Sequence, residues 1–375
     1  MTIPAIRVAS YCSSPSWGGL EMNVVRFLHW NNENGLPAVF YGRPESQMFR
    51  EAGRLGILVR PLNSTLKTGD LVNAFRLSRM LRADGINRLV VHQSQDLFVG
   101  AVARRLSSGG LRFIYSQHMH IGRDKKDWFH RWLYGQVDAV ATPVQWLADR
   151  VMEKTSIPRD RIHVVPRGIE MDRFTLAQPD RAAARERLRL PKDKLVLGVV
   201  GRLDPKKCQD TVVRALKIVH DAGHEAHLLL MGNQTFSEGD EYVMRVQALI
   251  RELAMGEFVH LRPHQDDVEW AYAALDIFVL ASKSEAYGMV TIEAMSSGLP
   301  VIGTADGGTL SLITPGETGL LVPPQDERKL ADAILALVRD KDLAARLGRR
   351  ARREALERFP HTRQVEAWKR LLIGL

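Results

Sequence analysis

The sequence predicts an α/β protein with two doubly wound domains. The chain has 375 residues, which is long for one hydrophobic core and sufficient for two. Short apolar runs alternate with stretches in which apolar residues recur at three- and four-residue spacing, a pattern typical of parallel sheets covered by helices on both faces. Residues 168–194 are rich in Arg, Ala, Asp and Pro and contain no strand pattern, so we place the domain junction near Arg173.

The expected strands follow from the apolar runs. In the first half they are Ile6–Tyr11, Pro37–Tyr41, Ile57–Leu62, Arg88–His92, Arg112–Gln117, Ala139–Thr142 and His163–Pro166. In the second half they are Leu195–Val200, His227–Met231, Val259–Arg262, Ile277–Ala281, Pro300–Gly303 and Leu320–Val322. Helical spacing is clear in Leu20–Trp30, Ala74–Ala83, Thr211–Ala222 and Tyr242–Ala254. We therefore expect an N-terminal domain of residues 1–172, a C-terminal domain of residues 173–355 and a last helix within residues 356–375.

Composition narrows the class of protein. With 45% hydrophobic and 25% charged residues, the chain has the make-up of an ordinary globular protein. No apolar run approaches the roughly 18 residues of a membrane span, and the first residues do not resemble a secretion signal. We therefore expect a cytoplasmic protein. Cys12 and Cys208 lie far apart and fit no metal-binding spacing, which favours reduced thiols.

Positive charge is concentrated near the C-terminus. The net charge is +9, and the segment Arg346–Arg358 holds six arginines against two glutamates. Two interpretations stay open: a solvated helix face, or attraction to an anionic membrane surface or a phosphorylated acceptor. The aromatic run Asp127–Val137 also has two interpretations: core packing of a helix, or contact with a lipid-linked acceptor. No nucleic-acid motif occurs.

The strongest chemical signal is the segment Ser284–Ile302, SEAYGMVTIEAMSSGLPVI. Glu285 and Glu293 stand eight positions apart around Gly288, where the missing Cβ lets the backbone approach a ligand. The expected helix Val290–Ser296 would present unpaired N–H groups and its dipole to an anion. The two carboxylates can accept hydrogen bonds from two sets of hydroxyls, such as those of a sugar and a ribose. By itself this spacing is weak evidence for a ligand site, because a helix with a solvated glutamate face has the same spacing.

A second motif, LVLGVVGRLDPKKCQD, opens the C-terminal domain. Its strand ends at Gly201, Arg202 follows directly, and Lys207 lies five residues further, near the start of the helix Asp210–Ala222. Two cations at this edge suit a leaving diphosphate, on which negative charge grows as the sugar bond breaks. The alternative is a pair of surface cations in a loop. We expect a lowered thiol pKa and ready alkylation at Cys208, which nucleoside diphosphate would protect.

The N-terminal domain gives weaker signals. Gly18 and Gly19 lie between a strand and its helix, where backbone N–H groups can reach a phosphate, although turn chemistry explains many such pairs. His118 ends a strand at the edge where α/β proteins bind substrates, and His120 follows two residues later. A metal is not expected, because no third ligand has a telling spacing beside these two histidines.

Together these motifs resemble the retaining GT-B glycosyltransferases of family four, which are also called glycosyltransferase group 1 and carry an E-x7-E signature. The resemblance extends over nearly the whole chain and includes TADGGTLSLI and PGETGLLV. Two positions depart from it: Cys208 stands where the family has glycine, and Arg167 in VVPRGIEMDRF replaces the usual asparagine. The resemblance implies two Rossmann-like domains facing across a cleft, with the last helix crossing back to the first domain.

The resemblance also implies a function. The chain would move a hexose from a nucleoside-diphosphate sugar to a hydroxyl acceptor with retention, without protein nucleophile, metal or cofactor. The residues implied in catalysis are Arg202, Lys207, His118 and Glu285. The residues implied in donor binding are Gly18, Gly19, Gly201, Glu285, Gly288, Met289, Val290, Glu293 and Arg262. The acceptor would belong to cell-surface glycan, lipopolysaccharide or glycolipid synthesis and could be phosphorylated or lipid-linked, with the protein in peripheral contact with an anionic membrane.

Two other functions stay in view. A sugar-nucleotide epimerase or a glycosyl phosphorylase could share the fold. The epimerase would need no acceptor, and the phosphorylases usually carry a cofactor-bearing lysine or longer insertions that are not evident here. A non-catalytic module would instead bind membranes or polyanions in a salt-sensitive way and would have no affinity for nucleotides.

Overall fold

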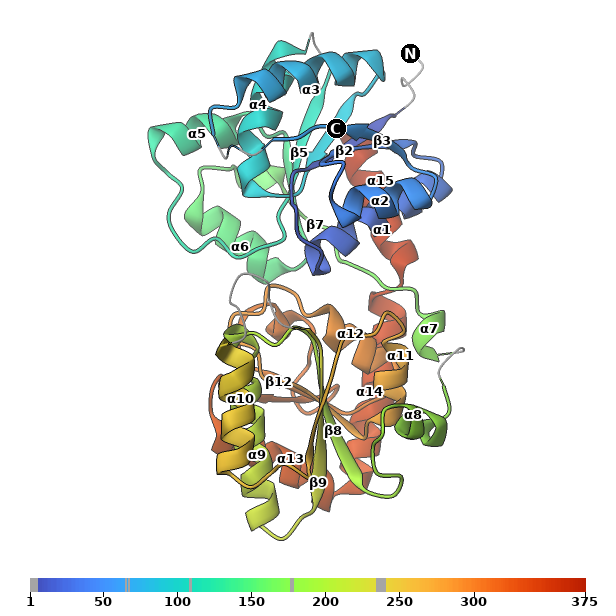
Figure 1. The fold of residues 1–375 in the computed structure, drawn as a ribbon. Coiled ribbons are helices and arrows are strands. Elements are labelled where there is room, and N and C mark those ends of the chain that lie inside the picture. The colour runs from blue at the N-terminus through green and yellow to red at the C-terminus, as the bar shows by residue number, and fades with distance from the viewer. Residues whose placement is uncertain (1–5, 65, 67, 108–109, 176–178, 234–240) are drawn as a thin grey trace. The chain divides into compact units, whose positions relative to one another are not determined.

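The computed structural model describes residues 6–64, 66, 68–107, 110–175, 179–233 and 241–375. The chain divides into two compact units (Figure 1). One, here the N-terminal unit, is Met1–Pro166 with Thr362–Leu375. The other, the C-terminal unit, is Arg167–His361.

The N-terminal unit contains a seven-stranded parallel sheet in the order β3-β2-β1-β4-β5-β6-β7. The strands are β1 (Val8–Cys12), β2 (Ala38–Gly42), β3 (Leu58–Pro61), β4 (Arg88–Val91), β5 (Arg112–Ser116), β6 (Ala139–Thr142) and β7 (Ile162–Val164). The helices are α1 (Gly19–Glu33), α2 (Gln47–Arg54), α3 (Leu71–Ala83), α4 (Leu97–Leu106), α5 (Trp128–Gly135), α6 (Gln145–Lys154) and α15 (His361–Gly374). The chain winds outward from β1 in one direction and then, from β4, in the other.

Two core clusters cover the faces of this sheet, and the alternation of side chains in β1 assigns them. Val8 and Cys12 pack with α1, α2 and α15, whereas Ala9 and Tyr11 pack with α3 and α4. The C-terminal helix is part of this core, because Trp368 stacks edge-on against Phe27 of α1 with ring centroids 4.7 Å apart. In Figure 1 the red α15 accordingly lies among the blue elements of the N-terminal unit.

The C-terminal unit contains a six-stranded parallel sheet in the order β10-β9-β8-β11-β12-β13. The strands are β8 (Leu195–Val200), β9 (Ala226–Met231), β10 (Val259–Arg262), β11 (Ile277–Leu280), β12 (Val301–Thr304) and β13 (Leu320–Val322). The helices are α7 (Asp172–Thr175), α8 (Arg181–Arg187), α9 (Gln209–Asp221), α10 (Glu241–Glu252), α11 (Glu269–Ala274), α12 (Met289–Ser296), α13 (Glu327–Arg339) and α14 (Lys341–Arg358). Short 3-10 turns are η3 (Pro205–Lys207) and η4 (Gly307–Ser311).

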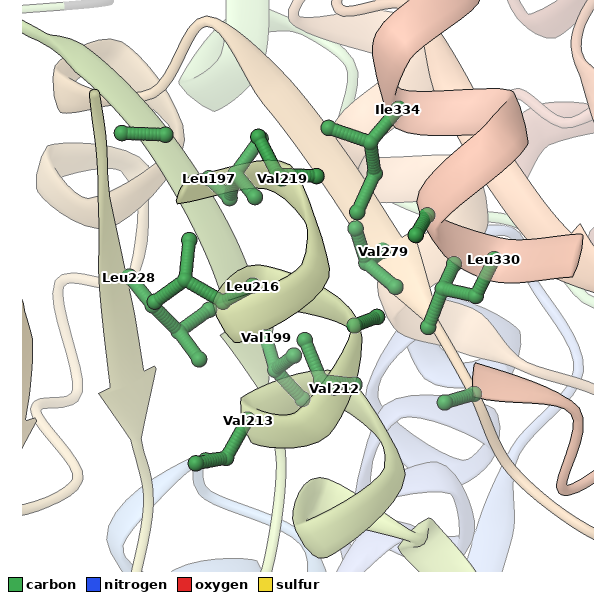
Figure 2. Packing of buried hydrophobic residues seen from close by; sticks show 14 of the residues in the cluster. Leu197, Val199, Val212, Val213, Leu216, Val219, Leu228, Val279, Leu330 and Ile334 are labelled. Atoms are coloured by element: carbon green, nitrogen blue, oxygen red, sulfur yellow. The ribbon is translucent and has the colours of Figure 1, made fainter. Parts of the chain in front are cut away.

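One face of this sheet packs against α9 and α13. Figure 2 shows the interlocking side chains: Leu197 and Val199 of β8 meet Leu216 and Val219 of α9, with Ile334 of α13 beside them. On the other face, Tyr272 of α11 packs at ring distances of 5.7 Å from Phe174 and 5.8 Å from Phe278. Because both faces are covered, the central strands are apolar throughout, as parallel strands require.

The expected strands are all present, each within two residues of its sequence-based bounds at either end. The sequence-based prediction of two doubly wound α/β domains is confirmed. Residues 168–194 hold the short helices α7 and α8, and the units divide after Pro166. The aromatic run at residues 127–137 forms α5, in which Leu133 and Tyr134 are buried in the core while Trp128 is exposed.

Candidate functional site

The loops that follow β8 and β11, together with helix α12, carry most of the sequence-predicted residues. These two strands are neighbours in the sheet. The chain continues from β8 to β9 on one side and from β11 to β12 on the other. Ligands of doubly wound sheets bind at such a switch point, outside the carboxyl ends of the strands. Gly201, Arg202 and Lys207 follow β8, while Glu285 and Gly288 follow β11, so the fold gathers the two motifs at one edge of the C-terminal unit.

Lys207 and Glu285 form the centre of this site. The Lys207 ammonium makes a short ion pair with the Glu285 carboxylate, and the two side chains are only 21% and 15% exposed. Burial alone would raise the pKa of Glu285, but the attraction and hydrogen bond of Lys207, with smaller contributions from Ser282 and the Tyr287 backbone, hold the pKa below its usual value. The carboxylate is therefore ionised and oriented at neutral pH.

Arg202 is placed differently. Its side chain is 58% exposed, and its guanidinium lies 3.7 Å from the carboxylate of Asp204. Asp204 itself is buried and caps the η3 turn, accepting a hydrogen bond of 2.8 Å from the backbone N–H of Lys206. Arg202 thus projects a charge from the same loop as Lys207, with a conformation that a ligand can change at little cost.

Helix α12 begins beside Glu285. Gly288 is its N-cap with φ of +91°, in the left-handed region that favours glycine. No side chain caps this end of the helix, so the backbone N–H groups at Met289 and Val290 belong to a first turn that can bind an anion. The predicted donor residues Gly288, Met289 and Val290 are therefore brought close to the Lys207–Glu285 pair.

The glycines of TADGGTLSLI hold the Glu285 loop in place. The backbone N–H of Gly308 donates to the Glu285 carbonyl at 2.7 Å. A Cβ at Gly307 would lie 2.3 Å from that carbonyl oxygen, and one at Gly308 would lie 2.5 Å from the Ala286 oxygen. These are approaches that side chains do not tolerate, so the glycine pair is needed for η4 to pack on the loop.

Glu293 projects from α12 and is almost fully buried. It accepts a hydrogen bond of 2.7 Å from the Tyr272 hydroxyl of α11. Sequence reasoning did not single out Tyr272, because nothing in EWAYAALDIF distinguishes this tyrosine from an ordinary core residue. Its hydroxyl holds one carboxylate oxygen of Glu293 and fixes the direction of the other.

Arg262 and Gly201 have structural contacts of their own. The Arg262 guanidinium donates to the backbone carbonyls of Leu188 at 2.8 Å, Leu261 at 2.9 Å and Arg189 at 3.2 Å. Gly201 has φ of +145° and packs so closely that a Cβ on Gly232 would lie 1.9 Å from its carbonyl oxygen. A role of either residue in binding the donor stays a prediction.

Arg167 contributes a further cation near Glu285. Its guanidinium lies 5.6 Å from the centre of the Tyr287 ring, and the Tyr287 hydroxyl donates to the Arg167 carbonyl at 2.8 Å. Burial lowers the pKa of Arg167 to about 10, against the opposing influence of Tyr287 and Glu285. The departure from asparagine therefore places a charged side chain against the loop of the Glu285 motif.

The expectation of a lowered thiol pKa at Cys208 is wrong. Its side chain is 2% exposed, and the thiol contacts the carbonyls of Pro205 at 3.4 Å and Lys206 at 3.8 Å. Burial raises the pKa of Cys208, the charge of Asp210 adds to this effect, and Lys283 only partly opposes it. The residue also has φ of +50°, the left-handed conformation that the usual glycine adopts without strain.

In the N-terminal unit, Gly18 and Gly19 begin α1. Gly18 is the N-cap, and no side chain caps the helix. A Cβ at Gly19 would meet no atom within 4 Å, so packing within the chain does not require glycine there. Glu21 in the first turn accepts a hydrogen bond of 2.5 Å from the Ser14 hydroxyl, which ties the helix to the loop after β1.

A buried carboxyl group lies beside that loop and was not predicted from the sequence. Asp96 accepts hydrogen bonds from the hydroxyl of Ser13 at 2.5 Å and from its backbone N–H at 3.1 Å. Burial raises the pKa of Asp96 to about 7, and the bonds from Ser13 and the charge of Arg43 only partly oppose it. No spacing in SQDLF distinguishes this aspartate from a surface residue.

His118 lies in a buried polar chain at the same edge. Its Nε2 is 3.0 Å from the Ser116 hydroxyl and 3.1 Å from Nδ1 of His92. His120 is elsewhere, with its ring stacked on Trp146 at 5.5 Å. Across the residues that the structure describes, no three His, Cys, Asp or Glu side chains are grouped so that they could hold a metal ion.

Two family models match most of the chain. Residues 17–173 match the family model "Glycosyltransferase Family 4", and residues 180–354 match "Glycosyl transferases group 1". D-inositol 3-phosphate glycosyltransferase from Nocardia farcinica is 36% identical over 211 residues, which cover 54% of this chain and 46% of the relative. The protein of that name from Streptomyces avermitilis is 32% identical over 214 residues, or 56% of this chain and 46% of the relative. The chain thus spans about half the length of the curated relatives it matches.

Solved structures share the fold over almost the whole chain. HepE from Anabaena in complex with UDP aligns over 99% of this chain and 100% of its own, with a TM-score of 0.88 and 20% identity. Sucrose-phosphate synthase from Thermosynechococcus elongatus aligns over 98% of each chain, with a TM-score of 0.77 and 22% identity. Along the described part of the chain, no helix combines the length and apolar character needed to cross a bilayer.

Proposed function

Because the chain belongs to the group 1 glycosyltransferases and has their GT-B fold, we propose that it transfers a sugar from a nucleoside-diphosphate sugar to a hydroxyl acceptor. The observation that carries the proposal is the Lys207–Glu285 ion pair beside the glycine-capped N-terminus of α12. A cation and a set of backbone N–H groups suit a diphosphate, while a fixed carboxylate suits sugar hydroxyls.

The proposed role of Lys207 and Arg202 is to stabilise the leaving diphosphate. Negative charge grows on it as the bond to the anomeric carbon breaks, and preorganised cations stabilise that charge most in the transition state. Backbone N–H groups at Gly18 and Gly19 would assist. The complexes of HepE with UDP and with UDP-glucose support UDP as the first nucleoside diphosphate to test as the carrier of the donor sugar.

The proposed sugar and ribose contacts come from the two glutamates. Glu285, with the backbone at Gly288 and Met289, would hold the sugar, and Glu293 would hold the ribose through the oxygen that Tyr272 leaves available. His118 would contact the sugar from the N-terminal unit. Hydrogen bonds from hydroxyls to charged acceptors are stronger than those between neutral groups, which makes both carboxylates suited to these roles.

We propose a reaction with retention that needs no metal. The acceptor hydroxyl would attack from the side of the leaving group, and the departing diphosphate would take its proton, so no protein nucleophile is required. Lys207 and Arg202 would supply the positive charge that a divalent cation supplies in metal-dependent enzymes. A hexose is the sugar class that the family resemblance favours.

The acceptor and location are proposed as follows. The inositol phosphate relatives support a phosphorylated hydroxyl acceptor, and the likeness to a lipopolysaccharide outer core galactosyltransferase makes a lipid-linked glycan a second test compound. Four of the exposed arginines of α14 share one face at helical spacing: Arg346, Arg349, Arg350 and Arg353. They would attract the protein to an anionic membrane on the cytoplasmic side, where cell-surface glycans are begun.

The test is a transfer assay with UDP-glucose and D-inositol 3-phosphate, without added metal and with a chelator. The proposal expects a glycosylated product whose anomeric configuration, read by proton NMR, matches that of the donor. A product with the opposite anomeric configuration would contradict the proposed retention. Conversion of the sugar nucleotide without acceptor would indicate an epimerase, and dependence on inorganic phosphate would indicate a phosphorylase. Salt-sensitive binding to anionic vesicles, compared between the wild type and a variant with Gln at the four α14 arginines, tests the membrane contact.

A further inference from the structure

The sheet edge of the N-terminal unit carries a hydrogen-bonded chain that the proposed reaction does not explain. Strands β1, β4 and β5 are neighbours, and Val91 of β4 is level with Tyr115 of β5. Ser10 lies on β1, His92 directly follows β4, and His118 lies two residues after β5. Three adjacent strands thus bring the side chains of one serine and two histidines together.

The contacts in this chain are short and buried. Ser10 Oγ is 2.7 Å from His92 Nε2, and His92 Nδ1 is 3.1 Å from His118 Nε2. Ser10 is 0% exposed, His92 is 2% exposed and His118 is 8% exposed. The His92 ring is also packed edge-on against Phe27, with centroids 5.7 Å apart, so it has little freedom to turn.

The hydrogen atoms in this chain can be placed by following Ser10. Within the described part of the chain, the Ser10 hydroxyl has His92 Nε2 as its one hydrogen-bond partner. A buried hydroxyl hydrogen without an acceptor is costly, so Ser10 donates to His92 Nε2, which must then carry a lone pair. A neutral His92 therefore has its proton on Nδ1, the atom that faces His118.

The same reasoning reaches His118. Nδ1–H of His92 donates to the one lone pair of His118 Nε2, and the Ser116 hydroxyl, 3.0 Å from the same atom, can act there only as a second donor that shares this lone pair. His118 Nε2 is thus an acceptor, and the ring proton of neutral His118 lies on Nδ1. The hydrogen bond made by one ring nitrogen decides what the other presents, which is a general means of setting histidine function.

We propose that His92 is a positioning residue, which with Ser10 fixes the tautomer of His118 so that its Nδ1 is always the hydrogen-bond donor. A donor at that atom suits an acceptor oxygen of the substrate, such as a sugar hydroxyl or a phosphoryl oxygen. The kinetic part of the test rests on the proposed transferase function, whereas the tautomer itself does not.

Asparagine and glutamine at position 92 form a matched pair of variants. The side-chain nitrogen of asparagine takes the place of Nδ1 and can still donate to His118, whereas that of glutamine takes the place of Nε2 and cannot. Ser10→Ala removes the hydroxyl that keeps His92 in its tautomer. Ser116→Ala is the control, because His92 still donates to His118 in that variant.

The direct measurement is a long-range proton–nitrogen NMR spectrum of protein labelled with nitrogen-15 in histidine, at mildly alkaline pH. The His118 signals are identified by their loss in His118→Gln. The proposal expects an Nδ1–H tautomer in the wild type, in His92→Asn and in Ser116→Ala. It expects a mixture of tautomers in His92→Gln and Ser10→Ala.

An Nε2–H tautomer in the wild type, or an unchanged His118 signal in His92→Gln, would overturn the proposal. If transfer activity is found, kcat should fall about tenfold in His92→Gln, the size typical of an outer partner that orients a functional histidine. The donor KM should change little, and His92→Asn should restore kcat. Equal kcat in the two variants would contradict the positioning role, while an absence of any transfer would count against the proposed function and leave the NMR result to decide the tautomer.

Discussion

The ammonium group of Lys207 lies directly against the carboxylate of Glu285, although 78 residues separate them in the chain. Each residue belongs to a different motif, and the pair joins the loop after β8 to the loop after β11. Both charges are therefore oriented before any ligand arrives, so a donor that binds here meets a preorganised cation and a preorganised carboxylate. Preorganisation of this kind is what makes charged groups effective in a transition state.

Replacing Lys207 by alanine should lower turnover. Loss of one preorganised donor costs about 2.7–4 kcal/mol of transition-state stabilisation, equivalent to a fall in kcat on the order of a hundredfold or more. The matched control is Lys206→Ala, an exposed lysine of the same turn. Initial rates at saturating donor decide the question, and a Lys207→Ala enzyme with near-wild-type turnover would remove this residue from the mechanism.

Arg202→Ala should reduce turnover by a similar factor, on the order of a hundredfold, without loss of stability. The side chain is 58% exposed and pairs only loosely with Asp204, so the folded protein depends little on it. Thermal unfolding and kcat should be measured on one preparation. Equal losses of stability and activity would point to a folding defect and against a role in the reaction.

Glu293→Ala should weaken the binding of nucleoside diphosphate, because the carboxylate is the proposed partner of the ribose hydroxyls. Tyr272→Phe serves as the control, since it keeps the carboxylate and removes the hydrogen bond of 2.7 Å. That variant should lose about 1–3 kcal/mol of folding free energy, the usual cost of a buried group left without its partner. Calorimetric titration with UDP measures the affinity, and an unchanged affinity in Glu293→Ala would contradict the ribose contact.

Asp96→Asn should change how stability depends on pH. The pKa of Asp96 is about 7 in the folded protein against an ordinary value of 3.8, so the unfolded chain gives up this proton first as the pH rises. The aspartate therefore reduces the free energy of unfolding progressively between these two pKa values, by up to about 4 kcal/mol at 1.36 kcal/mol per pKa unit. Asparagine does not ionise and can still contact Ser13. Denaturant unfolding at several pH values should show the advantage of the variant growing across this range and then staying constant, whereas parallel profiles would show that Asp96 does not titrate in this way.

Cys208 should react slowly with iodoacetamide in the folded protein. The thiol is buried and its pKa is raised, so little reactive thiolate is present. Nucleoside diphosphate should make no difference to a rate that burial already limits. Mass spectrometry of the native and the denatured protein gives the two rates, and fast labelling of native Cys208 that UDP suppresses would restore the earlier expectation.

Sequence reasoning was most successful where the signal is local and periodic. Apolar runs predicted every strand that the described residues form, and the signal is clearest in the central strands, because a strand buried on both faces must be apolar along its length. The Glu285 and Gly201 motifs could be placed at one sheet edge, because parallel strands end on the same side. The role of Gly288 could also be predicted, since glycine adopts without strain the left-handed conformation that this N-cap position requires.

The parts that were missed depend on tertiary packing. Tyr272, His92 and Asp96 are recognised only by what they contact, and their partners lie 21, 26 and 83 residues away. Cys208 was misjudged because neighbouring lysines are visible in the sequence whereas burial is not, and burial dominates its pKa. The contacts of Arg262 with three backbone carbonyls likewise depend on the fold, and no spacing in the sequence could have predicted them.

The measurement that tests the central claim most directly is thermal unfolding in the presence of UDP, GDP, ADP or CMP, with and without magnesium, for the wild type and Lys207→Ala. A ligand that binds only the folded state raises its stability, by about 2.7 kcal/mol at a hundred times the Kd. We expect one nucleoside diphosphate to raise the Tm of the wild type without magnesium, and a much smaller rise in Lys207→Ala. No change with any of the nucleotides, or equal shifts in both proteins, would contradict a donor site built on Lys207 and Glu285.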